Sequence, residues 1–311
     1  MRPVGRRVGL ALGIIALIVA VGALVVRYLS WPHTLVVAAA SVSPLVLVGA
    51  GVVAVVAFAT VRSWAPLGLA VAVLVAGLAV QAPLVLSDDD PPEHPITALT
   101  SNIQLGKGDV EQLADLVRSE RVDILAVQEL TPDAADRIAR STIAADLPNS
   151  FVRTGRLAGG TALYSRYPLS AAAALDGFAL TNVTAVVDVP GRGDVQVFVV
   201  HPVPPTSAGW AEELARIGTA MAAVAPERPV IALGDFNATT DHARYRRLLV
   251  DGYRDAGEVA GAGWLPTYPT DKTYPPVVGI DHVVVRGLTA AAVTSHHIAG
   301  ADHRAVLAEV G

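Results

Sequence analysis

The sequence predicts an α/β domain preceded by three membrane-spanning helices. Residues 1–86 contain five arginines and no aspartate, glutamate or lysine, whereas all 28 acidic residues of the 311-residue chain lie at Asp88 or later. From Ile96 onward, short apolar runs alternate with amphipathic stretches and turn signals, as in domains that alternate strands with helices. We therefore divide the chain into a membrane region (1–86), a linker (87–95) and an α/β domain (96–311).

Three uncharged apolar runs fill the membrane region, at about residues 8–26, 35–61 and 64–86. A helix needs roughly 20 residues to cross about 30 Å of hydrocarbon. A charge at its centre costs about 2.5–3.5 kcal/mol on the insertion scale, so the lack of charge favours membrane spans over buried helices of a soluble core. The first run has the basic start of a signal peptide, but it is longer than a usual signal sequence and two spans follow, so we interpret it as an anchor.

Charges around the first span predict the orientation of the chain. Arg2, Arg6 and Arg7 precede that span and favour a cytoplasmic N-terminus, whereas Arg27 and Arg62 divide evenly between the two short loops. An odd number of spans then places the α/β domain on the other side. The expected protein is a multi-pass cell-membrane protein with an extracytoplasmic C-terminal domain, and the absence of cysteine is consistent with an oxidising exterior.

The segment after the spans, "SDDDPPEHP", is acidic, proline-rich and without periodicity, which predicts an extended linker. Without the five membrane-region arginines, 18 basic residues face 28 acidic ones, a formal net charge of −10. This charge disfavours a broad nucleic-acid surface, whose affinity would come from lysine and arginine neutralising the phosphate backbone. No feature of the sequence predicts a protein partner.

The remaining residues are enough for one substantial core, and they contain neither an internal repeat nor a second linker. Asp109 and Ser207 are placed to cap two of the expected helices by accepting hydrogen bonds from otherwise unpaired amides. The expected strands are residues 97–103, 123–128, 161–165, 184–189, 195–200, 230–233, 281–285 and 305–309, and the expected helices are 109–119, 132–145, 208–223 and 242–250.

Polar residues converge on the ends of these expected strands. Each alone has a bland explanation, since Asp after Gly begins a turn, Asn caps and a lone His usually packs. Together they form the ligand and proton-carrier set that a phosphoryl-transfer site needs. The set comprises Asn102, Glu129, His201, Asp235, Asn237, Asp281, Asp302 and His303.

The chemistry of the set favours a hard divalent cation. Mg²⁺ prefers oxygen ligands and keeps several waters, so one or two carboxylates are enough to hold it against a substrate phosphate. Glu129 is the best ligand candidate. In "GDFN", Asp235 and Asn237 are two residues apart on an extended chain, so both can face one phosphate while Phe236 packs behind.

Eight short motifs occur in an order and spacing that resemble the endonuclease/exonuclease/phosphatase superfamily, similar to DNase I. They are "TSNI", "VQE", "GGTALYSRYPL", "VVHPVPP", "GDFNAT", "TYP", "GIDHVVV" and "ADHRAV". The resemblance covers Ile96 to Gly311 and implies a four-layer α/β sandwich, with two mixed sheets face to face, helices outside and an active site at one edge.

The resemblance also implies roles for the strand-end residues. Asn102 and Glu129 would bind Mg²⁺ or Mn²⁺, with Asp302 at or near that metal. His303 would lie beside the scissile phosphate, oriented by Asp281. Asp235 would orient or deprotonate the attacking water, and Asn237, His201 and Asn102 would contact the substrate.

The sequence departs from this pattern in places. "VVHPVPP" lacks the Thr or Asn that commonly precedes the histidine in nucleases, which leaves the substrate open, and Ala301 replaces a frequent serine. His282 is expected to pack, and His296 and His297 to lie on the surface. "LAGG" is not followed by Lys-Ser/Thr, so we reject a P-loop.

Three spans followed by such a domain resemble the actinobacterial teicoplanin-resistance membrane proteins of the VanJ type. That resemblance implies a lipid bilayer as partner and a lipid-linked phosphate of the cell envelope as substrate, hydrolysed by a metal-dependent phosphatase or phosphodiesterase. The alternatives are a catalytically silent resistance or binding protein, or an extracytoplasmic nuclease. A nuclease would use the few basic residues expected near the site, namely Lys107, Arg153, Arg156 and Arg166.

Overall fold

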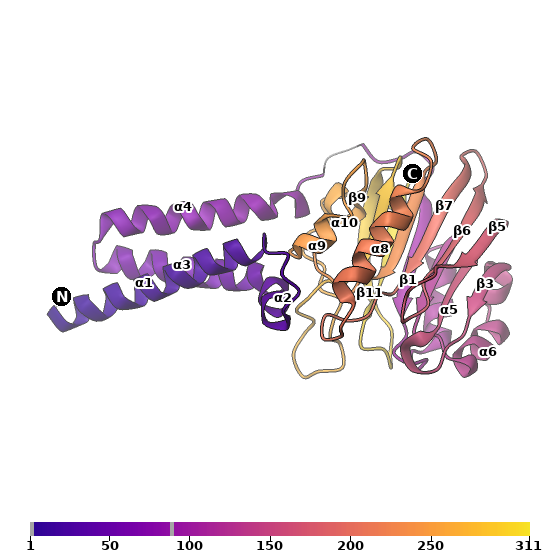
Figure 1. The fold of residues 1–311 in the computed structure, drawn as a ribbon, viewed down its shortest axis with the longest axis horizontal. Helices are drawn as coiled ribbons and strands as arrows, with labels where there is room; N and C mark the ends of the chain where they lie inside the picture. The colour runs from indigo at the N-terminus through magenta and orange to yellow at the C-terminus, as the bar shows by residue number, and fades with distance from the viewer. Residues whose placement is uncertain (1–2, 88–89) are drawn as a thin grey trace. The chain divides into compact units, whose positions relative to one another are not determined.

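The computed structural model describes residues 3–87 and 90–311 (Figure 1). Met1 and Arg2, and Asp88 and Asp89 within the predicted linker, lie outside the described residues. The chain divides into two compact units, which we describe separately. One comprises Met1–Pro83 and Thr240–Ala243, and the other Leu84–Thr239 and Arg244–Gly311.

Among the described residues, three helices are long and apolar enough to cross a membrane, at Val4–Val26, Ser43–Thr60 and Trp64–Leu84, and they make up most of the first unit. The second predicted span differs from the structure, which divides it into α2 (Thr34–Ser41) and α3 (Ser43–Thr60). Pro44 lies in the first turn of α3, where its missing N–H is tolerated, whereas inside one continuous helix it would remove a hydrogen bond and clash with the preceding turn. The other helices of this unit are α1 (Pro3–Val26) and α4 (Trp64–Gln81), which the 3₁₀ turn η1 (Ala82–Leu84) follows.

The second unit is built on two mixed six-stranded sheets with the orders β11-β12-β1-β2-β4-β3 and β5-β6-β7-β8-β10-β9. Each sheet has one parallel pair at its centre, β1 with β2 and β7 with β8. The strands are β1 (Ile96–Asn102), β2 (Ile124–Gln128), β3 (Asn149–Arg153), β4 (Thr161–Ser165), β5 (Leu169–Ala174), β6 (Val183–Val189), β7 (Gly193–Val200), β8 (Val230–Asp235), β9 (Arg254–Asp255), β10 (Asp281–Arg286), β11 (Ala290–His297) and β12 (Arg304–Val310).

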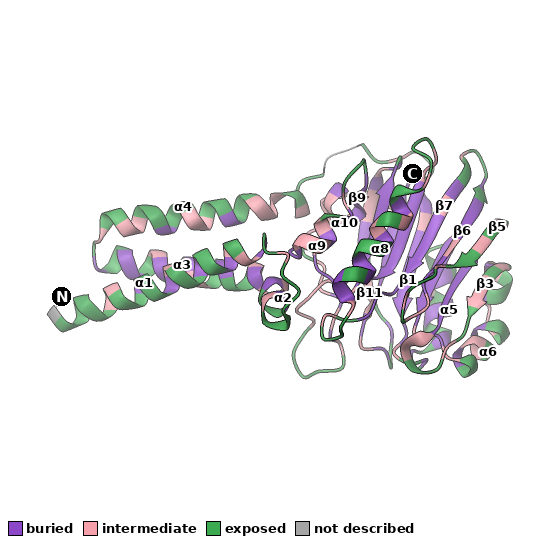
Figure 2. Cartoon of the chain, in the orientation of Figure 1, coloured by how far each residue is buried: buried purple, intermediate pink, exposed green. Residues whose placement is uncertain are grey.

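Alternation along the central strands builds the layers. Ala98 and Ile124 of the first sheet pack against Val197 and Ile231 of the second, in a core between the two sheets. Leu99, the neighbour of Ala98, points the other way and packs under the helices that cover the first sheet. Most of the strand residues are therefore buried, as Figure 2 shows in purple. The predicted four-layer α/β sandwich is confirmed.

Helices cover the outer faces. The first sheet is covered by α5 (Val110–Ser119), α6 (Pro132–Arg140) and α7 (Ile143–Asp146). The amphipathic helix α8 (Trp210–Ala222) buries its apolar face. The short helices η2 (Leu157–Gly159), α9 (Ala243–Arg246) and α10 (Ala256–Val259) complete the set.

The helix predictions were partly wrong. Asp109 caps α5 by accepting from the amides of Glu111 and Gln112, as predicted. Ser207 caps nothing, because α8 begins after Gly209, whose left-handed φ of 99° starts the helix. The expected helix at 132–145 breaks at Ser141, and that at 242–250 shrinks to the four residues of α9.

Candidate active site

Strand direction explains why the polar residues meet. The carboxyl ends of the parallel strands β1 and β2 carry Asn102 and Glu129 at one edge of the first sheet, because Asn102 pairs with Gln128. β12 runs antiparallel to β1, so His303 and Asp302, which precede β12, return to the same edge. The sheet topology therefore gathers four residues from three separate segments.

The second sheet presents a matching edge. His201 follows the end of β7, and Asp235 ends the parallel strand β8. Asp281 begins β10, which is antiparallel to β8, and pairs directly with Asp235. Gly234 is required before Asp235, because its φ is 150° and a Cβ there would collide with the carbonyl oxygen of Val200.

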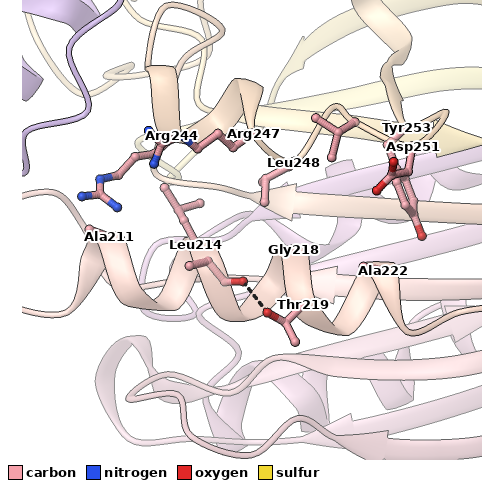
Figure 3. A pocket seen from close by; sticks show the side chains of 12 residues that line it. Ala211, Leu214, Gly218, Thr219, Ala222, Arg244, Arg247, Leu248, Asp251 and Tyr253 are labelled. Carbon is pink, nitrogen blue, oxygen red and sulfur yellow. Dashed lines mark hydrogen bonds between the residues drawn. The ribbon is translucent and has the colours of Figure 1, made fainter.

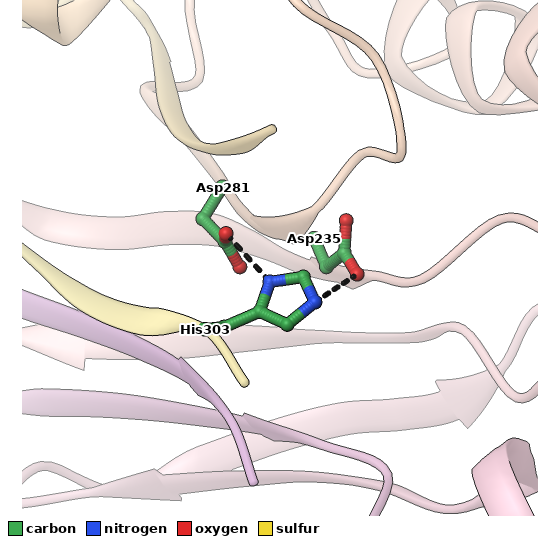
Figure 4. A group of neighbouring side chains, drawn as sticks. All are labelled: Asp235, Asp281 and His303. Carbon is green, nitrogen blue, oxygen red and sulfur yellow. Dashed lines mark hydrogen bonds and ion pairs between the residues drawn. The ribbon is translucent and has the colours of Figure 1, made fainter. Parts of the chain in front are cut away.

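His303 lies between two aspartates, as Figure 4 shows. Its Nδ1 lies 2.8 Å from Asp281 Oδ2, within hydrogen-bond distance. Its Nε2 lies 3.7 Å from Asp235 Oδ2, which is too long for a hydrogen bond. Asp281 therefore fixes the ring, while Nε2 is left to act on a third group.

Asp235 and His201 face each other in the same way. His201 Nε2 lies 3.7 Å from Asp235 Oδ2, and both residues are buried. The other oxygen of Asp235 accepts a hydrogen bond from the amide of Asn237 at 2.8 Å. Asn237 has a left-handed φ of 50° and donates from its side chain to the carbonyl of Pro202 at 2.9 Å. This turn holds Asp235 and Asn237 beside the His201 loop.

Asn102 links the two sheets. Its Nδ2 donates to Glu129 Oε1 at 3.2 Å and to Asp235 Oδ2 at 3.1 Å. Glu129 Oε2 accepts from the amide of Leu105 at 2.8 Å. Glu129 itself has a left-handed φ of 58°, an uncommon conformation for this residue type, which turns its side chain out of β2. Residues predicted from separate strand ends thus form one connected cluster.

Protonation differs between the two histidines. Burial alone would lower the pKa of His303, but the carboxylates of Asp281 and Asp235 raise it to about 10, so the ring is an imidazolium at neutral pH. Burial lowers the pKa of His201, and the charge of His303 adds to that effect, so His201 is neutral. Burial raises the pKa of Asp235, although His303 opposes the shift. The site therefore pairs a charged ring with a neutral one across a single carboxylate.

The donor set near Glu129 fits a divalent cation. Asp302 has a raised pKa, because it is partly buried and because the carboxylate of Glu129 repels its negative charge. Two neighbouring carboxylates are ligands that a hard cation prefers. The Asn102 amide lies beside Glu129, with its oxygen accepting from the amide of Gln104 at 3.0 Å. Asp235, Asp281 and His303 also offer ligand atoms within 4.8 Å of one another and could hold a metal. In that trio Nδ1 and a carboxylate oxygen are engaged with each other at 2.8 Å, and both oxygens of Glu129 likewise accept hydrogen bonds, from Asn102 and from Leu105.

Two residues that sequence reasoning missed contact this cluster. The ring of Tyr268 lies against that of His303, with centroids 4.8 Å apart. Trp210 Nε1 donates to the carbonyl of Asn237 at 3.0 Å. The "TYP" motif contained the signal for Tyr268, whereas Trp210 is simply the first residue of α8 and carries no local signature.

Other candidates lie elsewhere. His296 and His297 are on the edge strand β11, where His297 is exposed, as predicted, and His296 is half-buried. A cavity of about 310 Å³ lies beside α8, between Leu214 and Leu248, and Arg244 and Arg247 line it as well (Figure 3). None of the predicted site residues lines this cavity.

Comparison with known proteins identifies the fold. Residues 99–303 match the endonuclease/exonuclease/phosphatase family. Similar solved structures include an endonuclease/exonuclease/phosphatase of Beutenbergia cavernae (20% identity, 70% of this chain, 72% of that chain, TM-score 0.57). D. rerio TDP2 complexed with single-strand DNA product is also similar (14% identity, 70% of this chain, 99% of that chain, TM-score 0.58). So is the mannosyl-6-phosphatase Bt3783 of Bacteroides thetaiotaomicron (15% identity, 70% of this chain, 99% of that chain, TM-score 0.56). No curated protein matches.

Proposed function

The chain belongs to the endonuclease/exonuclease/phosphatase family, and from that premise we propose that it is a membrane-anchored, divalent-metal-dependent phosphoric ester hydrolase. The observation that carries the proposal is the placement of His303, which Asp281 holds at 2.8 Å while its free nitrogen faces Asp235 at 3.7 Å. A buried imidazolium with one nitrogen left to act on a substrate is suited to a centre where negative charge develops.

Glu129, Asp302 and Asn102 are the residues that would hold the metal. When bound, Mg²⁺ or Mn²⁺ would polarise the phosphoryl group and offset its negative charge. Glu129 is oriented by hydrogen bonds from Asn102 and from the amide of Leu105, and a bound metal would take the place of the Asn102 bond.

The other residues divide the work of hydrolysis. Asp235 orients the attacking water or accepts its proton, and its raised pKa suits it to that role. The Nε2–H of His303 donates to the phosphoryl or the leaving oxygen. His201 and Asn237 hydrogen-bond the remaining phosphoryl oxygens. Water oxygen bonds to phosphorus as the bond to the leaving oxygen breaks, and no covalent enzyme intermediate is required.

A lipid-linked phosphate of the cell envelope is the substrate that we favour. The three candidate spans would keep the site beside a bilayer, which raises the effective concentration of a membrane-borne substrate without any new contact. We place the catalytic domain outside the cytoplasm, because three arginines precede the first span and the number of spans is odd.

The charge distribution disfavours a nuclease. Arg166 follows β4, at the end of the sheet opposite Glu129, where it pairs with Asp123 at 3.0 Å. Of the four basic residues considered, Lys107, Arg153 and Arg156 remain, against a net charge of −10 for residues 87–311.

The full-length chain in lipid nanodiscs, supplied with Mg²⁺ or EDTA, tests the proposal. Its substrates would be a polyprenyl pyrophosphate, a sphingomyelin-type diester and plasmid DNA. We expect metal-dependent product from a lipid phosphate, its loss in His303→Asn and its retention in the surface control His297→Asn. Product from DNA alone would favour the nuclease, and no product from any substrate would favour a catalytically silent protein.

A further inference from the structure

A second buried polar group lies behind the catalytic turn Asp235–Ala238. It consists of His282, Asp255 and Tyr245, all of which are buried. Asp255 Oδ2 lies 2.8 Å from His282 Nδ1 and accepts a hydrogen bond from the Tyr245 hydroxyl at 2.5 Å. None of the three belongs to the cluster of site residues. Their polar groups have left water, so their hydrogen bonds to one another need a reason beyond filling space.

Both ring nitrogens of His282 face acceptors. While Nδ1 faces the Asp255 carboxylate, Nε2 lies 2.9 Å from the carbonyl oxygen of Ala238. Neither a carboxylate nor a carbonyl donates a hydrogen, so both contacts are made only when both nitrogens carry one. The buried ring is then a cation, compensated by Asp255.

The Ala238 carbonyl belongs to the turn that presents two candidate catalytic residues. Asp235 and Asn237 face the site, whereas Phe236 lies edge-on to the rings of His282 and Tyr245, with centroids 5.8 Å and 5.4 Å away. Asn237 has a left-handed φ of 50°, which asparagine adopts more readily than most residue types. His282 provides a contact one residue further along.

Other contacts hold the earlier part of the turn, including the hydrogen bond from the Asn237 side chain to the carbonyl of Pro202. The Trp210 indole donates to the Asn237 carbonyl, and the Phe236 amide donates to the carbonyl of Ile280. Both hydrogen bonds are made by residues that precede Ala238 in the turn. The bond from His282 joins the turn to β10, the strand that also carries Asp281.

We propose that His282 and Asp255 form a positioning pair that holds the Asp235–Ala238 turn, and through it Asp235 and Asn237, in register with the Asp281–His303 pair. Neither member touches substrate. The inference rests on the proposed function for its effect on rate, but its effect on the turn is independent of any reaction. It replaces the expectation that His282 merely packs.

Kinetics separate positioning from packing. His282→Phe fills the space without donating, and His282→Gln keeps one donor that can reach Ala238. We expect kcat to fall about 10- to 100-fold in His282→Phe with KM within threefold, because a shift of about 1 Å costs up to about 10²-fold. His282→Gln should lie between that variant and the wild type. Asp255→Asn keeps the acceptor that caps α10 but removes the charge, and should also lower kcat.

A matched control removes a buried hydrogen bond elsewhere. Tyr253 is buried and its hydroxyl donates to the Met221 carbonyl at 2.6 Å, away from the turn. Tyr253→Phe should keep kcat within twofold of the wild type. If His282→Phe also keeps kcat within twofold of an active wild type, the pair does not position the turn.

A spectroscopic readout needs no substrate. The Trp210 indole N–H donates to Asn237 within the same turn, so its resonance in the full-length, ¹⁵N-tryptophan-labelled chain in nanodiscs reports where the turn lies. We expect that resonance, assigned by its loss in Trp210→Phe, to move in His282→Phe and Asp255→Asn and to stay in Tyr253→Phe. An unmoved resonance in the first two variants would overturn the inference. An inactive wild type would contradict the proposed function alone, and the indole resonance would still decide this one.

Discussion

Replacing Asp281 by Asn should cost most of the activity, because Asp281 supplies the largest charge interaction that keeps His303 protonated. The pKa of His303 is raised from 6.5 to about 10. This difference corresponds to about 5 kcal/mol of preference for the charged ring, at about 1.4 kcal/mol for each pKa unit. Among the carboxylates that raise this pKa, Asp281 comes before Asp235 and Asp302, so Asp281→Asn should lower it most.

Asp281→Asn also removes the carboxylate that orients the His303 ring at 2.8 Å, so we expect kcat to fall about 100-fold, the typical cost of losing one positioned donor to developing charge. The assay is the initial rate of phosphate release by the full-length chain at saturating metal, from pH 6 to pH 10. The sign of the pH effect is fixed: His303 is charged below its pKa, so the loss of activity with rising pH should move to lower pH in Asp281→Asn.

A control keeps the chemistry of the substitution but not its place. Asp188→Asn changes an exposed carboxylate on β6 of the same sheet and should leave both the rate and the pH profile unchanged. A rate for Asp281→Asn within threefold of the wild type at pH 7, or an unmoved pH profile, would refute this account of His303.

Three further predictions concern the metal, the fold and the membrane. EDTA should abolish activity, Mg²⁺ or Mn²⁺ should restore it, and Glu129→Gln should raise the metal concentration for half-maximal activity at least about 10-fold. Asp109→Ala should lower the free energy of unfolding by about 0.5–2 kcal/mol in denaturant titrations, because it removes the cap of α5, whereas Ser207→Ala should change it by less than about 0.5 kcal/mol. A reporter enzyme that works only outside the cytoplasm, fused after Gly311, should be active; activity only of a cytoplasmic reporter would reverse the proposed orientation.

The sequence predicted the central strands of both sheets and missed all four edge strands, β3, β5, β9 and β11. The physical reason is burial. A central strand such as β2 is buried at every residue and appears as a continuous apolar run, whereas β5 and β3 are mostly half-exposed or exposed. Periodicity therefore carries little signal at the edges of a sheet.

The candidate site could be predicted because its residues stand at strand ends, where chain direction alone decides which of them meet. Tertiary contacts added what no local pattern encodes. The hydrogen bond from Trp210 to the Asn237 carbonyl joins residues 27 apart, and that of His282 to Ala238 joins residues 44 apart. Similarly, Ser207 is a residue type that often caps helices, but the left-handed Gly209 sets the start of α8.

The central claim is that side chains from both sheets act on one phosphate. A double-mutant cycle with Glu129→Gln of the first sheet and Asp235→Asn of the second tests this most directly, through the rate of phosphate release from a polyprenyl phosphate by the full-length chain. Each single variant should lose at least about 100-fold, and the double variant should be barely slower than the worse single one, because residues that act as a unit are strongly non-additive. Single variants that keep the wild-type rate, or losses that multiply fully as for independent sites, would contradict the claim.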